Sequence, residues 1–327
     1  MRAIVVDRHG GPEVLKIAER PEPHPGPDEV LVQVEASGIN FIDTYHRTGY
    51  YPLPLPFVPG VEGVGTVLEV GSEVPARLSV GDRVGWVKVT GSYAERVAVP
   101  YQRLVTIPPD VDWETAAACL LQGVTAHYLT NDTYPIRPGD TALVLAAAGG
   151  VGLLLTQLIK HKGGRVIGVV SSPEKEKLAL AAGADEVLRY EDTAHPADLA
   201  AEVRRRNGGH GVAVVYDGVG RATFDFSLAS LRRHGVLVQY GQASGPVPPV
   251  PLKRLADAGS LYLTRPAFND HIVDRAELVG RVDDILTLVA AGELRVHVGG
   301  RYPLADAHLA HRDLQSRRTT GKLLLLP

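Results

Sequence analysis

The sequence predicts an α/β protein that joins an antiparallel, barrel-like β domain to a doubly wound parallel sheet. Its first third consists of short alternating strands between Gly-rich and Pro-rich turns, whereas its middle alternates apolar strands with helical segments. The chain has 327 residues, of which 45% are hydrophobic, and this suffices for two domains with substantial cores.

The predicted β domain begins in residues 1–122. Segments such as EVLVQVEASGI (29–39) and VEGVGTVLEVG (61–71) alternate apolar and polar residues with the period of half-buried strands. Turn-forming stretches such as HPGPDE (24–29) and YYPLPLPFVPG (50–60) lie between them. The close spacing of these turn signals indicates an antiparallel arrangement.

The parallel sheet is predicted in residues 123–264. Apolar runs such as LVLAAA (143–148) and VAVVYDGV (212–219) alternate with helical segments such as GLLLTQLIKHKG (152–163). Strands that are apolar on both faces are typical of a parallel sheet covered by helices on both sides. Residues 265–327 mix the two patterns again, with two amphipathic helices and a final apolar strand.

The composition excludes several functional classes. A net charge of −3 gives no electrostatic basis for binding nucleic acid or an anionic membrane. Cys119 is the single cysteine, which rules out an internal disulfide and a cysteine-based zinc site, and its apolar surroundings predict a buried, inert thiol. The sequence starts as a strand and a turn and has no apolar run of about 18 residues, so we expect a cytoplasmic protein.

The segment AAAGGVG (146–152) connects a predicted strand to a predicted helix. Ala147, Gly149 and Gly152 occupy the three positions of a G-x-G-x-x-G pattern, with alanine at the first. Gly149 would let the backbone approach a pyrophosphate, and Gly152 would let the helix pack closely on the sheet. A simple tight turn is the alternative, but the strand–loop–helix context favours a dinucleotide site.

The next strand, RVIGVV, bears on the identity of the dinucleotide. An NAD site places an acidic residue at the end of this strand, but here the strand ends in Ser171 and Ser172, with Lys175 shortly after. Hydroxyls and an ammonium suit a 2′-phosphate, so the sequence favours NADP(H) over NAD. In the alternative interpretation, one serine caps the following helix and the lysine is simply solvated.

A family resemblance becomes apparent once these motifs are taken in order along the chain. They are HGGPEVL (9–15), GINFIDTYHRTGYY (38–51), PGVEGVGTV (59–67), GDRV (81–84), AAAGGVG (146–152), VVYDGVG (214–220), GSLYLTRP (259–266) and YPLADA (302–307). Together they resemble the zinc-independent quinone oxidoreductases of the medium-chain dehydrogenase/reductase superfamily, the branch that includes zeta-crystallin. The resemblance implies a GroES-like catalytic domain in residues 1–122 and 265–327 around a Rossmann-type NADPH-binding domain in residues 123–264. It also implies a homodimer that pairs through an edge strand near 260–265.

Two substitutions distinguish the chain from the zinc alcohol dehydrogenases of that superfamily. Those enzymes carry a ligand cysteine where this chain has Asn40, and a histidine where it has Val61. The four-cysteine lobe that holds their structural zinc has no counterpart, and we expect His308 and His311 to lie on a solvated helix face. We therefore expect a protein without a metal ion.

A metal-free site is compatible with quinone reduction. Hydride addition to a quinone yields a delocalised phenolate, for which a few neutral hydrogen-bond donors suffice. Two alternatives stay open. One is an NADPH-dependent alkenal or enone reductase on the same scaffold, and the other is a nucleotide-binding structural or regulatory protein with little turnover.

The resemblance also implies which residues form the site, in a cleft between the two domains. Asn40, Tyr45 and Tyr51 would contact the substrate, although a helix cap and ordinary packing are the respective alternatives. The solvated-arginine and surface-tyrosine interpretations stay open for Arg317 and Tyr190. The residues implied for the cofactor are Asn40, Asp43, Tyr45, Gly149, Gly150, Val151, Ser171, Lys175, Tyr190, Gly241, Gln242, Ala243, Ser244, Thr264 and Arg317.

Overall fold

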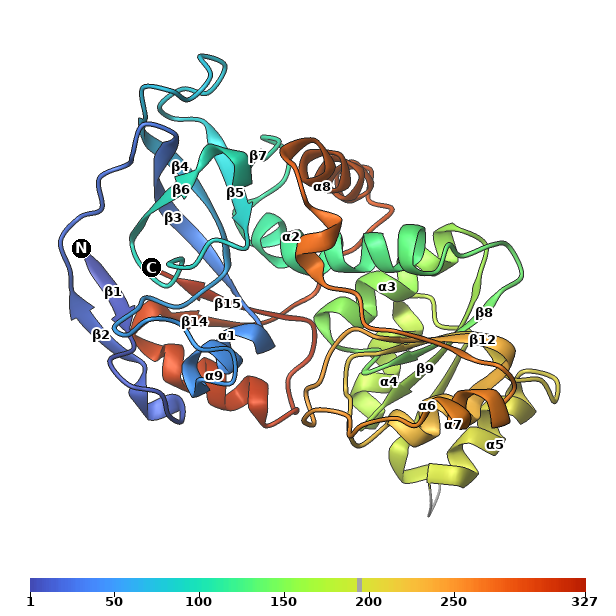
Figure 1. Ribbon diagram of the computed structural model, residues 1–327. Coiled ribbons are helices and arrows are strands. Elements are labelled where there is room, and N and C mark those ends of the chain that lie inside the picture. The colour runs from blue at the N-terminus through green and yellow to red at the C-terminus, as the bar shows by residue number, and fades with distance from the viewer. Residues whose placement is uncertain (193–195) are drawn as a thin grey trace. The chain divides into compact units, whose positions relative to one another are not determined.

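The computed structural model describes residues 1–192 and 196–327, which form two compact units. Unit 1 comprises Met1–Val124 and Val273–Pro327, and unit 2 comprises Thr125–Ile272. These divisions fall after residues 124 and 272, whereas the sequence places its domain boundaries after residues 122 and 264. Figure 1 shows both units coloured along the chain.

Unit 1 is built mainly of β-strands. Its strands and helices are β1 (Arg2–Val5), β2 (Lys16–Glu19), β3 (Glu29–Ile39), α1 (Phe41–Thr48), β4 (Glu62–Val70), β5 (Arg83–Val87), β6 (Arg96–Pro100), β7 (Leu104–Thr106), the first part of α2 (Trp113–Tyr128), α8 (Arg275–Ala290), β14 (Val298–Pro303), α9 (Ala307–Gln315) and β15 (Lys322–Leu326).

The large sheet of unit 1 has the order β14-β15-β3-β4-β5-β7, and β6 pairs with β3. All of these pairs are antiparallel except β14 with β15, and the path given by the pairings is open. The antiparallel β domain expected from the sequence is therefore present. Strand β15 lies antiparallel to β3, with Leu324 opposite Gly38, and this register brings the end of the chain beside the start of α1.

Unit 2 contains the alternating strands and helices. They are the end of α2, β8 (Thr141–Leu145), α3 (Gly150–His161), β9 (Arg165–Val170), α4 (Pro173–Ala181), β10 (Glu186–Arg189), α5 (Pro196–Arg206), β11 (Val212–Asp217), α6 (Phe224–Ser230), β12 (Leu231–Gln239), α7 (Leu252–Asp257) and β13 (Tyr262–Thr264).

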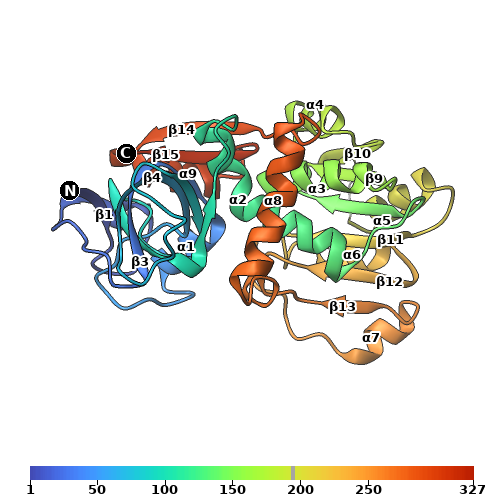
Figure 2. The ribbon, with the colours of Figure 1, turned by 90° about the horizontal axis from the view of Figure 1, so that it is seen from above.

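The sheet of unit 2 is parallel throughout its described strands, in the order β10-β9-β8-β11-β12-β13. Figure 2 shows these strands from above with the connecting helices along them. The order corresponds to 3-2-1-4-5-6 of a Rossmann-type sheet, as the sequence predicts. Leu143, Ile167 and Val215 lie in its fully buried core, which explains why these strands are apolar on both faces.

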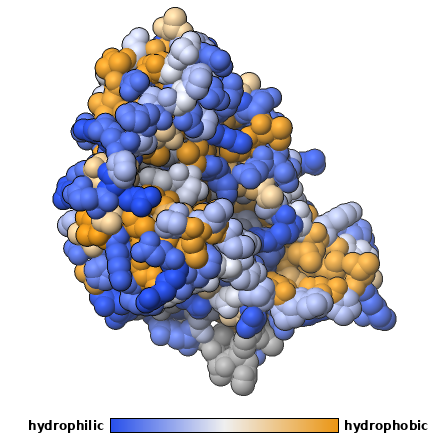
Figure 3. All heavy atoms as spheres, turned by 60° about the vertical axis from the view of Figure 1, so that its left-hand side comes forward, coloured by the Kyte–Doolittle hydropathy of each residue, from blue (hydrophilic) through white to orange (hydrophobic). Residues whose placement is uncertain are grey.

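No helix in the described part of the chain is long and apolar enough to cross a membrane. Figure 3 shows hydrophobic and hydrophilic side chains interspersed over the face in view. The exposed large hydrophobic side chains include Tyr262 and Leu263 on β13, an edge strand of the parallel sheet.

Candidate functional site

The glycine loop joins β8 to α3 at the carboxyl edge of the parallel sheet. Gly149 is the N-cap residue of α3, so the backbone amides of the first helical turn start directly at the end of β8. A Cβ atom at Gly152 would lie 2.4 Å from the carbonyl oxygen of Ala146, so that only glycine fits there. This contact holds the helix start close against the strand end, in the role predicted for Gly152.

The tight turn of this loop lies one residue earlier than the pattern suggests. Ala146 has a φ of 50°, in the left-handed region that non-glycine residues rarely occupy. The sequence assigned the first position of the pattern to Ala147, which is buried. The strained residue thus directly follows β8, three residues before the N-cap Gly149, in the loop that leads to the helix N-terminus where a phosphate would approach.

The loop lies at the topological switch point of the sheet. Strand β8 is flanked by β9 on one side and by β11 on the other, and the connections from it run in opposite directions. In open parallel sheets this is where ligands bind, at the carboxyl ends of the strands. Strands β9, β10 and β12 end at the same edge, and the segments after them, together with the glycine loop after β8, carry most of the residues proposed for the cofactor.

Ser171 and Lys175 form a polar pair at the end of β9. The Lys175 Nζ lies 3.1 Å from the Ser171 Oγ, and partial burial lowers the pKa of the ammonium. Ser172 is the N-cap residue of α4, because its Oγ accepts the Lys175 backbone N–H at 3.4 Å. The helix-capping interpretation therefore holds for Ser172, while Ser171 and Lys175 remain together at the strand end.

The other residues proposed for the cofactor lie in both units. Tyr190 directly follows β10 and is about one-third exposed, and Thr264 ends β13. The segment Gly241, Gln242, Ala243 and Ser244 follows β12, where the Ser244 N–H and Oγ both donate to the Val219 carbonyl at 2.7 Å. Arg317 follows α9 in unit 1 and has a φ of 60°.

Asp217, at the end of β11, has a structural role. Its buried carboxylate accepts from the backbone N–H groups of Val219 and Gly220 and from the hydroxyls of Thr223 and Ser227, at 2.7 to 3.0 Å. Four donors satisfy this carboxylate and shape the loop that follows β11. The hydrogen bonds of this carboxylate are thus made to residues that closely follow it in the chain, and they stabilise that segment.

Helix α1 carries the residues of unit 1 that the sequence proposes for the site. Asn40 is its N-cap residue, and the Asp43 carboxylate accepts the Asn40 backbone N–H at 2.8 Å. Tyr45 is half-buried, and its ring lies edge-on to that of Tyr51 with centroids 5.5 Å apart. Tyr50 joins them at 4.9 Å from Tyr51, which makes an exposed aromatic group next to the helix.

The side chain of Asn40 belongs to a buried ionic cluster with Glu62 and Lys322. The Lys322 Nζ donates to the Asn40 Oδ1 at 2.8 Å and to the Glu62 Oε1 at 2.5 Å. The Asn40 Nδ2 in turn donates to the Glu62 Oε1 at 2.7 Å and to the Gly38 carbonyl at 3.3 Å. The other Glu62 oxygen accepts the Leu121 backbone N–H, so this buried charge pair is well hydrogen-bonded.

This cluster does not fit a zinc ion. Both amide hydrogens of Asn40 are used, its oxygen accepts from an ammonium, and Val61 offers a buried apolar side chain. Among the residues that the structure describes, no group of three or more His, Cys, Asp or Glu side chains is placed to hold a metal. The chemistry proposed below therefore uses no metal step.

A second buried chain of polar side chains links α1 to α9. Tyr93, between β5 and β6, donates to Asp43 and contacts His311, which in turn contacts Arg47. The expectation that His311 is solvated is wrong, because its side chain is fully buried in these contacts. The sequence pattern did not reveal this role. The other buried residues of α9 are Ala307 and Ala310, and two alanines make too weak an apolar face to indicate that His311 is buried beside them.

Cys119 is buried in α2, as expected, and its thiol donates to the Ala116 carbonyl. Burial raises the pKa of this thiol to about 12, so it stays protonated at neutral pH. A buried thiol that stays protonated is a poor nucleophile.

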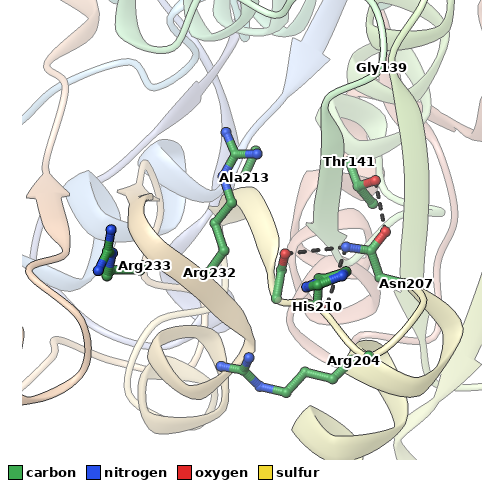
Figure 4. A pocket seen from close by; sticks show the side chains of 10 residues that line it. Gly139, Thr141, Arg204, Asn207, His210, Ala213, Arg232 and Arg233 are labelled. Atoms are coloured by element: carbon green, nitrogen blue, oxygen red, sulfur yellow. Dashed lines mark hydrogen bonds between the residues drawn. The ribbon is translucent and has the colours of Figure 1, made fainter.

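A pocket of about 480 Å³ lies at the opposite, amino-terminal edge of the parallel sheet (Figure 4). Its lining includes Thr141 at the start of β8 and Arg232 and Arg233 of β12. Asn207 also lines the pocket. Its side chain accepts from the Thr141 hydroxyl and donates to the His210 and Gly211 carbonyls. The position of the pocket separates it from the glycine loop, so it is no part of the proposed nucleotide site.

A parallel sheet with a glycine loop at its switch point, combined with an antiparallel sheet domain, defines a nucleotide-dependent dehydrogenase or reductase of the medium-chain class. Comparison with known families agrees with this class. Residues 26–109 match the alcohol dehydrogenase GroES-like domain, and residues 150–279 match the zinc-binding dehydrogenase family.

Individual relatives narrow the class further. The quinone oxidoreductase of Pseudomonas aeruginosa is 44% identical over 321 residues, which cover 98% of this chain and 97% of that protein. A solved mycobacterial protein complexed with NADPH is 50% identical with a TM-score of 0.97, and Escherichia coli quinone oxidoreductase complexed with NADPH is 41% identical with a TM-score of 0.96. Both structures are covered completely, as is this chain. The chain belongs to the quinone oxidoreductase family of the medium-chain dehydrogenase/reductase superfamily.

A further relative has a different named activity. The 2-haloacrylate reductase of a Burkholderia species is 37% identical over 334 residues, which cover 99% of this chain and 98% of that protein. A relative that matches this chain over nearly its whole length is thus named for the reduction of 2-haloacrylates.

Proposed function

We propose that this protein reduces small quinones with NADPH and without a metal ion. The observation that carries the proposal is the Ser171–Lys175 pair at the end of β9, where an NAD enzyme holds a carboxylate. The full-length relation to proteins named quinone oxidoreductases supports the choice of substrate.

NADPH is proposed to bind mainly to residues at the carboxyl edge of the unit 2 sheet. The amides at the start of α3, including those of Gly150 and Val151, would bind the pyrophosphate, aided by the helix dipole. Lys175 and Ser171 would bind the 2′-phosphate through its charge and hydrogen bonds, with Tyr190 nearby on the same sheet edge. Gly241, Gln242, Ala243, Ser244, Thr264 and Arg317 are proposed to line the rest of the cofactor site.

NADPH supplies the hydride in this chemistry. The quinone oxygen that gains negative charge would be stabilised by neutral donors, for which the Tyr45 and Tyr51 hydroxyls on unit 1 are the candidates. The side chain of Asn40 is proposed as a positioning group, since Lys322, Glu62 and Gly38 already occupy its amide. Asp43 would support the same helical turn.

The test is a comparison of cofactors and metals in one assay. NADPH oxidation by 1,4-benzoquinone should proceed in the presence of EDTA, with kcat/KM for NADPH at least tenfold above that for NADH. Preference for NADH would contradict the proposed 2′-phosphate site, and inhibition by EDTA would contradict the proposal that no metal ion is needed.

A reductase of conjugated carbonyl compounds is the second candidate function, favoured by the relation to a 2-haloacrylate reductase. The same NADPH assay should be run with an enone and with 2-chloroacrylate at concentrations equal to that of the quinone. A kcat/KM higher for these substrates than for the quinone would favour a reductase of conjugated carbonyl compounds over a quinone reductase. NADPH binding without turnover of any of them would instead indicate a nucleotide-binding protein of another role.

We further propose a cytoplasmic homodimer that pairs through β13. This short edge strand exposes Tyr262 and Leu263, and an exposed edge offers unpaired backbone groups to a second copy. Light scattering should give a mass near twice 35.0 kDa, and Leu263→Lys should shift it toward the monomer. A monomeric wild-type protein would refute the dimer.

A further inference from the structure

Four buried side chains of unit 1 form one continuous hydrogen-bonded chain. The Arg47 Nη1 lies 3.2 Å from the His311 Nδ1, and the His311 Nε2 lies 3.0 Å from the Tyr93 Oη. The Tyr93 Oη lies 3.2 Å from the Asp43 Oδ2. Arg47 and Asp43 both belong to α1, so the chain leaves this helix, passes through α9 and the segment before β6, and returns to it.

Elementary hydrogen-bond chemistry fixes the direction of every link. A guanidinium has only donors, so the His311 Nδ1 must accept from Arg47. Burial, reinforced by the charge of Arg47, lowers the pKa of His311 to about 3, so the ring is neutral at neutral pH and carries its proton on Nε2. That N–H donates to the Tyr93 oxygen, which leaves the tyrosine hydrogen for Asp43.

Asp43 is the acceptor at which this chain ends. Its Oδ2 accepts from both Tyr93 and the Asn40 backbone N–H, whereas its buried Oδ1 has no hydrogen-bond partner in the described structure. Burial raises the pKa of Asp43 to about 7, while the Asn40 N–H, the Lys322 charge and the Tyr93 hydroxyl act against this rise. Glu62 raises the pKa, and Lys88 is a further charge that interacts with Asp43.

We propose that Arg47, His311 and Tyr93 are positioning residues that fix the donor direction toward Asp43, and thereby set the pH at which the first turn of α1 becomes negatively charged. Asn40 precedes this turn and Tyr45 follows it, so the charge of Asp43 is felt where the substrate-contacting residues are proposed to lie. The catalytic consequence, but not the titration itself, rests on the proposed quinone reduction.

Arg47 gives the sharpest test of the direction, because its side chain hydrogen-bonds to Gly10, His311 and Gln315 and acts on Asp43 through His311 and Tyr93. Without Arg47, the proton of His311 can move to Nδ1, and Tyr93 can donate to the free Nε2 instead of to Asp43. The carboxylate then loses a donor, and its pKa rises. Loss of the Tyr93 hydroxyl in Tyr93→Phe has the same effect directly, and a hydrogen bond to a charged group corresponds to a shift of about one pKa unit or more.

The experiment follows the carboxyl ¹³C signal of Asp43 with pH in the full-length protein labelled at aspartate, assigned by its loss in Asp43→Asn. Tyr93→Phe and Arg47→Met should raise its midpoint by about one pKa unit. Arg47→Lys, which keeps a cationic donor, should hold the wild-type midpoint. Tyr216→Phe, which removes another buried tyrosine hydroxyl, in unit 2, is the matched control and should also leave it unchanged.

Two further measurements complete the test. The ¹⁵N spectrum of labelled histidine should place the proton of His311 on Nε2, and kcat for quinone reduction should show an inflection that moves upward with the Asp43 midpoint in Tyr93→Phe. An unchanged midpoint in Tyr93→Phe, or a proton on Nδ1 in the wild type, would overturn the proposal.

Should Arg47→Met fail to fold, Tyr93→Phe still tests the proposal by itself. An absence of quinone turnover would refute the proposed function, while the carboxyl titration would still test this inference.

Discussion

One lysine in each unit illustrates two different uses of charge. In unit 1, Lys322 and Glu62 are almost completely buried, and each is held by several hydrogen bonds. In unit 2, Lys175 lies at the sheet edge, and its Nζ is 3.1 Å from the hydroxyl oxygen of Ser171. A buried pair must be satisfied within the fold, whereas a half-exposed ammonium beside a hydroxyl can still bind an anion. The comparison indicates that the charge of Lys322 serves the fold, whereas the charge of Lys175 is placed to recognise a ligand.

Lys322→Met should produce the largest effect on stability. The change leaves the Glu62 carboxylate buried without its counter-charge, which costs about 3–5 kcal/mol of unfolding free energy. Urea denaturation measures the loss. The double variant Glu62→Gln/Lys322→Met removes both charges and should recover much of it, whereas an additive loss in the double variant would contradict the interpretation as a coupled pair.

Gly152→Ala tests the close packing of α3 on the end of β8. The added Cβ would meet the backbone of Ala146 and Ala147, so we expect a loss of about 1–3 kcal/mol in stability and weaker NADPH binding. Gly280→Ala is the matched control, because Gly280 lies within α8 with open space around its Cβ position. The control should gain up to about 1 kcal/mol from helix propensity. Equal effects of the two changes would show that packing on Ala146 is unimportant.

Lys175→Glu should separate ligand binding from stability. It replaces the partner of the 2′-phosphate with a repelling charge, so Kd for NADPH should rise roughly 10–100-fold while Kd for NADH changes little. Quenching of protein fluorescence measures both. Lys177→Glu, on an exposed position of the same helix, is the control for a general change of charge. A similar loss for both cofactors would place Lys175 outside the phosphate site.

Ser172→Ala should give the smallest effect. Its hydroxyl caps α4, and loss of such a cap costs about 1 kcal/mol. The neighbouring change Ser171→Ala leaves the cap intact, so thermal unfolding should distinguish the two. NADPH binding should respond in the reverse order, with Ser171→Ala weakening it more. The opposite ranking would exchange the roles assigned to the two serines.

Much of the fold follows from local sequence patterns. The parallel strands and their helices were predictable because buried apolar runs and amphipathic segments alternate regularly. The absence of an acidic residue at the end of β9 can likewise be read from the sequence. The antiparallel strands β3 and β4 were also visible in the alternation of their residues. These signals are local, and each lies within one element or one loop.

The buried clusters of unit 1 were not predictable in the same way. Lys322 heads the apolar segment KLLLLP, and its pairing with Glu62 depends on the register of β15 against β3, which joins residues far apart in the chain. His311 and Arg47 likewise meet only when α9 packs near α1. The left-handed conformation of Ala146 could not be predicted either, because the G-x-G-x-x-G pattern places its first position at Ala147 and says nothing about the φ of Ala146.

The position of β15 in the sheet has a consequence for synthesis on the ribosome. Strand β3 is made early, but its neighbour β15 is made only after unit 2, and the counter-ion of Glu62 arrives with it. Unit 2, in contrast, is a continuous segment that ends at Ile272. The nascent protein can therefore complete unit 2 while the end of β3 at Ser37–Ile39, which pairs with β15, still has an open edge. The partly made sheet with this open edge is the form that most needs protection from aggregation.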